Sequence, residues 1–217
     1  TTLTPWRPRR VYGHDALFAS IPHPSARNLV YNDATVYDDV SWLVRDADRP
    51  CVHVEGNDGA GKSYLVQQLT EETGLRSLPS MGPIKSEKER DQRVFQRLRP
   101  NVIVDRSSGL ISELVYGPTL RNELLGNRGW YEQVLSSIKR CVTFVYCETQ
   151  VERLKHESRS DEDPEHVRAV NANLQRLDNA YHTVFDNMLA GHRVIRYDWT
   201  RGGDQLNILR KKLCADW

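Results

Sequence analysis

Short apolar runs alternate with helical periodicity from Cys51 onward. Strand-like runs cover 51–55, 75–78, 102–105, 142–146 and 193–197. Between them, apolar residues recur three and four positions apart, which predicts helices over 62–70, 86–98, 109–115, 130–138 and 203–213. The same spacing between Val167 and Met188 predicts one long helix that begins at Pro164. This alternation predicts an α/β fold with a parallel five-stranded sheet sandwiched between helices.

Residues 1–50 show a different pattern. Prolines at 5, 8, 22 and 24 and the lack of a sustained period predict an irregular N-terminal arm. Asp33 is a suitable N-cap for a short helix carrying Val36, Val40 and Leu43, which ends before Pro50. We therefore divide the chain into an arm with a short helix, 1–50, and one α/β domain, 51–217.

The turn after the first apolar run carries the strongest chemical signal. Residues 56–63 read GNDGAGKS and match the phosphate-binding pattern GxxxxGK[ST], with a strand before it and an amphipathic helix after it. Small residues let successive N–H groups face one anion at the positive end of a helix. Lys62 is expected to reach the β- and γ-phosphates of ATP, and Ser63 to bind Mg²⁺. The predicted nucleotide-binding residues here are Asn57, Asp58, Gly59, Ala60, Gly61, Lys62, Ser63 and Tyr64.

A second candidate site follows the run 102–105. Asp105 ends this predicted strand, so it should lie at the carboxyl edge of the sheet beside the phosphate loop, where it could serve Mg²⁺. Arg106 can place a permanent positive charge on a phosphate oxygen. The alternative is that Asp105 caps the next helix and Arg106 is merely exposed.

With both motifs, the chain resembles the thymidylate kinase and deoxynucleoside kinase branch of the P-loop kinases. The residues that carry the resemblance are Glu55 to Ser63 and Asp105-Arg106-Ser107, while Ser112-Glu113 and Val115 to Pro118 are similar to small virus-encoded members. The resemblance implies catalytic roles for Lys62, Asp105 and Arg106. It also implies a mobile lid around 151–163 with Arg153 and Arg159 over the triphosphate, and Thr200 and Arg201 beside the adenine. A solvated charged loop is an equal alternative for the lid.

The acceptor side departs from that family. The Arg-Glu-Pro stretch with which cellular thymidylate kinases grip the acceptor is missing, and Arg93 and Arg97 could replace it. The family analogy brings Gln175 or Tyr181 to the acceptor base, whereas the apolar spacing around Tyr181 favours a core position. Tyr116 is open to the same two interpretations. His53, inside a strand, is interpreted as a hydrogen-bonded core residue.

The composition of the chain bears on its binding partners and on its location in the cell. Lysine plus arginine total 30 against 29 acidic residues, a net charge of +1, so no global field favours nucleic acid or membranes. The Arg7, Arg9 and Arg10 cluster is more typical of a solvated arm than of a DNA contact. No stretch approaches the roughly 18 apolar residues that span a bilayer, and the four cysteines form no CxxC pair. We expect a cytoplasmic protein, in the host cytoplasm if viral, and a homodimer stays open.

The leading hypothesis is an ATP- and Mg²⁺-dependent kinase of a deoxynucleoside or its monophosphate, with a pyrimidine as the expected base. An alternative keeps the same core but phosphorylates a hydroxymethylated pyrimidine, such as 5-hydroxymethyluracil, within viral DNA. A second alternative is an ATPase without a small acceptor. The guanine-reading Asn/Thr-Lys-x-Asp motif of GTPases is missing after 142–146, where the chain reads Cys-Glu-Thr-Gln.

Overall fold

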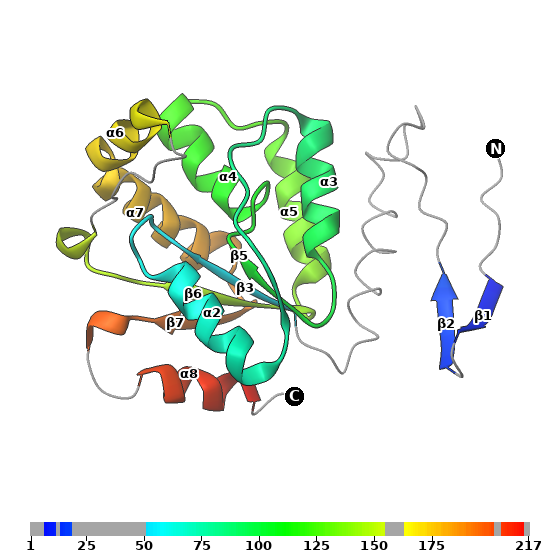
Figure 1. Ribbon diagram of the computed structural model, residues 1–217. Coiled ribbons are helices and arrows are strands. Elements are labelled where there is room, and N and C mark those ends of the chain that lie inside the picture. Colours follow the sequence, from blue (N-terminus) through cyan, green and yellow to red (C-terminus); the bar gives the residue numbers. More distant parts are fainter. Residues whose placement is uncertain (1–6, 12–13, 19–50, 155–162, 202–204, 215–217) are drawn as a thin grey trace.

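A central parallel sheet organises the protein. The computed structural model describes residues 7–11, 14–18, 51–154, 163–201 and 205–214 (Figure 1). Five strands pair in the order β4-β5-β3-β6-β7, all parallel. Their bounds are β3 Cys51–Gly56, β4 Arg76–Leu78, β5 Val102–Asp105, β6 Val142–Cys147 and β7 Arg193–Tyr197. The predicted fold class and all five predicted strands are confirmed.

Strand register brings the two sequence motifs together. The central strand β3 lies between β5 and β6, with Val54 opposite Asp105 and Gly56 opposite Cys147. The carboxyl ends of β3 and β5 therefore lie side by side, and the glycine-rich loop begins next to Asp105. In parallel sheets this edge is where ligands bind.

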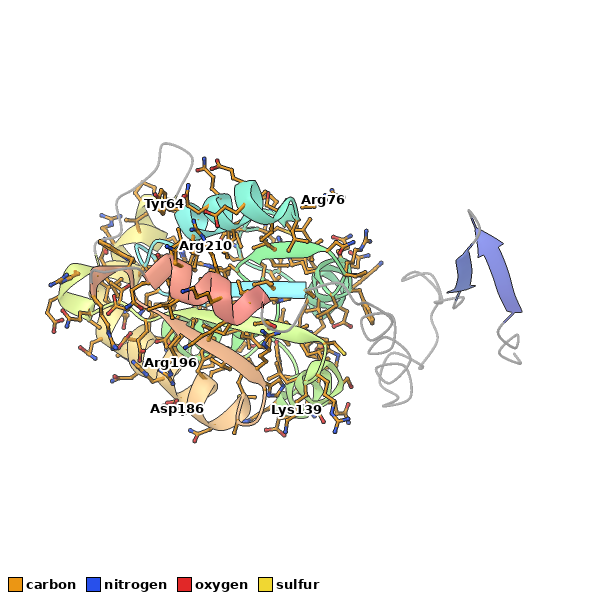
Figure 2. The ribbon with its side chains drawn as sticks, turned by 90° about the horizontal axis from the view of Figure 1, so that it is seen from below. Tyr64, Arg76, Lys139, Asp186, Arg196 and Arg210 are labelled. Carbon is orange, nitrogen blue, oxygen red and sulfur yellow. The ribbon has the colours of Figure 1, made fainter. Side chains whose placement is uncertain are left out.

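Helices cover both faces of the sheet. Successive residues of a strand point to opposite faces, so each strand contributes side chains to both helical layers. Val52 and Val54 pack with α2 (Lys62–Thr73) and α8 (Gln205–Cys214). Arg210 of α8 forms an ion pair with Glu72 of α2 and joins these two helices (Figure 2). Phe144 and Tyr146 face the other layer, where Figure 1 shows the remaining large helices. That layer contains α3 Glu87–Arg97, α4 Ile111–Tyr116, α5 Arg128–Ile138 and α7 Leu174–Thr183.

The prediction of one long helix from Pro164 is wrong at one position, Asn173. The chain forms α6 (Pro164–Ala172) and α7, which continues into a π-helical turn, Val184–Met188. Asn173 interrupts it: its Nδ2 donates to the Ala169 carbonyl at 2.9 Å, and its Oδ1 accepts from Arg176 at 3.0 Å. Asparagine side chains that bond to nearby backbone compete with the helical ladder. The apolar seam nevertheless survives the break, since Val170 and Leu177 are both buried.

The arm contains regular structure that the sequence did not predict. Arg7–Val11 (β1) and His14–Phe18 (β2) pair as antiparallel strands, with Val11 opposite His14. Only two residues separate the strands, the commonest spacing for a hairpin. The predicted helix between Asp33 and Pro50 lies outside the described residues. Within the described part of the chain, no helix combines the length and apolar character needed to cross a membrane.

Candidate active site

The glycine-rich loop connects β3 to α2. Gly56 has a φ of 144°, and a Cβ there would lie 2.6 Å from the Cys147 carbonyl oxygen, so the position excludes a side chain. Gly59 and Gly61 both have a φ of 79°, in the left-handed region that glycine adopts without strain. This backbone allows the loop and the first turn of α2 to direct N–H groups toward one anion.

Lys62 begins α2, and its side chain lies buried across the loop. Its Nζ donates to the Asn57 carbonyl at 2.6 Å and lies 4.0 Å from Oδ1 of Asp58. Burial lowers the pKa of Lys62, the charge of Arg106 lowers it further, and Asp58 acts in the opposite direction. The loop therefore holds a poorly solvated cation, which the phosphates of a nucleotide would stabilise.

The two predicted metal ligands meet. The Ser63 hydroxyl donates to Oδ2 of Asp105 at 2.7 Å, joining the first turn of α2 to the end of β5. The Ser63 lone pairs stay available because its proton points to the carboxylate. Both are hard oxygen donors, and Mg²⁺ usually takes few protein oxygens alongside water and phosphates. These residues fit a magnesium site that a nucleotide would complete.

Asp58 links the loop to the predicted catalytic arginine. Its carboxylate forms an ion pair with the Arg106 guanidinium and accepts the Tyr116 hydroxyl at 3.0 Å. Arg106 also lies 5.0 Å from the centre of the Tyr116 ring. Burial alone would lower the pKa of Arg106, but Tyr116 and Asp58 outweigh it and hold that pKa well above its ordinary value. Arg106 is therefore a permanent cation beside the loop.

The backbone at Arg106 is unusual. Its φ is 65°, a left-handed conformation that costs a non-glycine residue about 1–2 kcal/mol. The surroundings hold it there: its N–H donates to Val54 at 3.0 Å, and its carbonyl accepts from Arg97 at 3.2 Å. Strain of this kind gathers at functional sites. Here it turns the Arg106 side chain toward Asp58, while Ser107 turns toward the sheet.

Glu55 holds this turn from beneath, a role that the sequence analysis missed. Its buried carboxylate accepts the Ser107 N–H, and burial raises the pKa of Glu55. His53 lies on the same face of β3, with Nδ1 2.7 Å from the Ser107 hydroxyl and Nε2 3.3 Å from the Arg97 carbonyl. Burial lowers the His53 pKa to about 3, so the ring is neutral. This hydrogen bonding agrees with the predicted core role of His53.

Asp178 on α7 is a second residue that the sequence did not reveal. Its Oδ1 accepts from the Asn57 amide at 3.0 Å, and His182 lies 3.5 Å from its Oδ2. The contacts continue through Glu148 to Arg196 and Asp186, which Figure 2 shows together on the β7 side. Asp178 lies 121 positions from Asn57, which explains why no local motif marks it.

The predicted acceptor arginines bind the backbone of residues 79–83. Arg93 donates to the Gly82 carbonyl and forms an ion pair with Glu89, and Arg97 donates to the Pro79 carbonyl at 2.5 Å. Both side chains are buried. Their guanidinium groups hold this segment against α3, and their role toward the acceptor stays a prediction.

The predicted acceptor residues on α7 differ in position. Tyr181 is fully buried, 5.9 Å from the Tyr146 ring centre and 6.2 Å from that of Tyr116. This position agrees with the core interpretation of Tyr181, and its role toward the acceptor stays a prediction. Gln175 is exposed, and its amide donates to Asn179 at 3.2 Å, so its acceptor role stays a prediction. Among the predicted acceptor residues, Tyr116 contacts the loop.

The residues predicted beside the adenine lie at a short 3₁₀ turn, Trp199–Arg201, that follows β7. Arg153, in a second such turn (Val151–Arg153), lies 3.4 Å from the Thr200 carbonyl. Tyr64 is exposed on the first turn of α2. Arg159 and most of the predicted lid lie outside the described residues.

Comparisons with solved structures agree with this fold. The Bacillus subtilis YorR protein, solved in complex with phosphorylated GDP, aligns over 76% of this chain and 94% of its own at 20% identity, with a TM-score of 0.58. The M. mycoides deoxyadenosine kinase with bound dCTP aligns over 76% and 98% at 14% identity, with a TM-score of 0.52. No protein-family model and no curated protein matches the sequence. At these identities the likeness establishes the fold of P-loop kinases.

Proposed function

We propose that this protein is an ATP- and Mg²⁺-dependent kinase that phosphorylates a deoxynucleoside or a deoxynucleoside monophosphate, with a pyrimidine as the expected base. The observation that carries the proposal is that the two sequence motifs contact each other. Ser63 donates a hydrogen bond to Asp105, and Asp58 forms an ion pair with Arg106. A phosphate loop alone binds a triphosphate. A carboxylate and an arginine joined to it supply what transfer of the γ-phosphoryl group requires.

In the reaction an acceptor oxygen forms a bond to the γ-phosphorus while the bond from that phosphorus to the β,γ-bridging oxygen breaks, and ADP leaves. Lys62 and Arg106 would stabilise charge on the transferring group, with Arg159 proposed to assist from the lid. Magnesium held through Ser63 and Asp105 would neutralise phosphate charge. Catalysis then rests on positioning and electrostatics, without a covalent intermediate.

The residues around Asp58 are compatible with a hydroxyl acceptor, as in a deoxynucleoside, or with a phosphate acceptor, as in a monophosphate. Asp58, a residue of the loop, contacts both the Arg106 guanidinium and the Tyr116 hydroxyl, so a carboxylate, a cation and a phenol lie together at the loop. A hydroxyl acceptor must lose a proton during transfer, and the Asp58 carboxylate would accept that proton. A phosphate acceptor needs no base and would use the Arg106 charge.

The test is a panel of deoxynucleosides and deoxynucleoside monophosphates incubated with Mg²⁺ and labelled ATP, with Lys62→Met as the inactive control. Labelled product from at least one acceptor is the expected result. Clear ATP binding with no labelled acceptor would refute the proposal.

Two further arms separate the alternatives. Label that enters DNA containing 5-hydroxymethyluracil, but not free nucleotides, would place the acceptor in a polymer. Rapid ATP hydrolysis that no acceptor changes would favour an ATPase.

A further inference from the structure

Asn57, in the phosphate loop, depends on a distant helix for its side-chain hydrogen bond. The residue is 2% exposed, and its Nδ2 donates to Oδ1 of Asp178 on α7 at 3.0 Å. In the part of the chain that the structure describes, Oδ1 of Asn57 has no hydrogen-bond partner. A buried amide is costly when its polar atoms are left without partners. The orientation of the Asn57 side chain therefore depends on Asp178.

The main chain of Asn57 is part of the phosphate-binding geometry. Its carbonyl accepts from Lys62 Nζ at 2.6 Å and from the Ala60 N–H at 3.2 Å. In the proposed function, Lys62 and the N–H groups of the loop are the groups that contact the phosphates. A change in the conformation of Asn57 would therefore displace both kinds of phosphate ligand.

Asp178 is itself supported by its neighbours. Its Oδ2 lies 3.5 Å from Nε2 of His182, whose Nδ1 lies 3.7 Å from Oε1 of Glu148. The His182 ring packs edge-on against the buried Tyr146, with 5.6 Å between ring centres. Burial raises the pKa of Asp178, whereas His182 and the hydrogen bond from Asn57 act in the opposite direction. Figure 1 shows α7 beside the turn that leads from β3 to α2, so one oxygen of Asp178 is held toward the loop.

We infer that Asp178 is a positioning residue of the phosphate loop, which it holds through the Asn57 amide in the conformation that binds a triphosphate. The inference rests on the proposed function because it requires a triphosphate on the loop. A loop that is ordered before the ligand arrives loses less conformational freedom on binding. The charge of Asp178 has the opposite effect, because a carboxylate repels phosphates. Removing a support weakens triphosphate binding, whereas removing a repulsive charge strengthens it.

The experiment measures binding of ATP and of inorganic tripolyphosphate, each with Mg²⁺, by calorimetry without an acceptor. Tripolyphosphate carries the phosphates but no base. We expect Asp178→Ala and Asn57→Ala each to bind both ligands about fivefold more weakly than the wild type. Asp178→Asn should stay within about twofold of the wild type, because its amide oxygen can still accept from Asn57. The double variant should bind no more weakly than either alanine variant, since both remove the same hydrogen bond.

Asp186→Asn is the matched control. Asp186 is a carboxylate at the outer end of the same series of contacts, where it forms an ion pair with Arg196 on the β7 side (Figure 2). This variant should bind ATP as the wild type does. Urea denaturation shows which variants are folded, and Asp178→Ser, with a shorter polar side chain, replaces Asp178→Ala if the alanine variant does not fold.

The other outcomes contradict defined parts of the inference. Additive losses in the double variant would show that Asp178 does not act through Asn57. Unchanged or tighter ATP binding by Asp178→Ala would overturn the supporting role, and so would a loss for ATP that tripolyphosphate does not share. An equal loss in Asp178→Asn would exclude the hydrogen bond as the cause. Wild-type protein that binds neither ligand would refute the proposed function as well, whereas a failed acceptor panel leaves these binding results intact.

Discussion

Replacing Lys62 by methionine should separate stability from catalysis. The substitution keeps an unbranched apolar stem and removes the ammonium, which donates to the Asn57 carbonyl at 2.6 Å. A hydrogen bond to a charged group contributes about 1.5–3 kcal/mol, and leaving its partner unsatisfied adds to the cost. The Asn57 carbonyl keeps a second donor, however, because the Ala60 N–H lies 3.2 Å away.

The stability lost with this hydrogen bond is offset, because the buried ammonium group destabilises the unliganded fold. Burial and Arg106 both lower the Lys62 pKa, which shows that its charged form is disfavoured there. We therefore expect the free energy of unfolding to change by less than about 1 kcal/mol. Catalysis has no such compensation, and losing one group that stabilises transition-state charge costs roughly 100- to 1,000-fold in rate.

Urea denaturation and acceptor phosphorylation, measured on the same preparations, test both numbers. A normal phosphorylation rate in Lys62→Met would show that the phosphate loop assignment is wrong. A loss of several kcal/mol in stability would instead make Lys62 a structural residue, and the fall in rate would carry no catalytic meaning.

Three further predictions concern the loop and its supports. Asp105→Asn should keep the fold but require at least about tenfold more Mg²⁺ for half-maximal activity, and an unchanged Mg²⁺ requirement would make Asp105 only a cap. His53 has a pKa lowered to about 3 by burial, so its contribution to stability is complete above pH 6.5 and is lost as the pH falls. Between pH 7 and 5 the wild type should lose about 2 kcal/mol more than His53→Asn, and equal losses would contradict the buried neutral ring. Gly56→Ala should destabilise by at least about 2 kcal/mol, because its Cβ would meet a carbonyl oxygen, whereas Gly82→Ala, with no atom within 4 Å, serves as the control. Equal stabilities of the two alanine variants would remove the steric argument.

The fold was predictable because its strongest signals are local. The runs 102–105 and 142–146 are apolar on both strand faces, which is typical of parallel strands buried between two helical layers. The break at Asn173 was not predictable, because the apolar seam passes through it and the interruption depends on one side chain bonding to the preceding turn. The strand pair Arg7–Val11 and His14–Phe18 was missed because Pro8 and the arginines around it hide the alternation that marks strands.

The site residues that belong to a local sequence motif could be predicted. Lys62, Ser63 and Asp105 follow from the loop pattern and the end of a strand. The backbone contacts of Arg93 and Arg97 could not be predicted, because a guanidinium binds a phosphate or a backbone carbonyl equally well, and only the path of residues 79–83 brings carbonyls to them. Asp178 could not be found from any local pattern, since its relation to Asn57 arises when α7 packs beside the loop.

The buried polar contacts suggest why the site is arranged before a ligand arrives. Glu55 accepts a hydrogen bond from the Ser107 N–H, and Asp58 forms an ion pair with Arg106. The Ser63 hydroxyl donates a hydrogen bond to Asp105. Each contact joins the phosphate loop or its strand to the end of β5 or the turn after it, so the two motifs cannot move apart without breaking hydrogen bonds. The arrangement also brings Lys62 and Arg106 close enough that the charge of one lowers the pKa of the other. A polyphosphate relieves that repulsion, so the unfavourable charge of the free protein becomes binding energy for an anion.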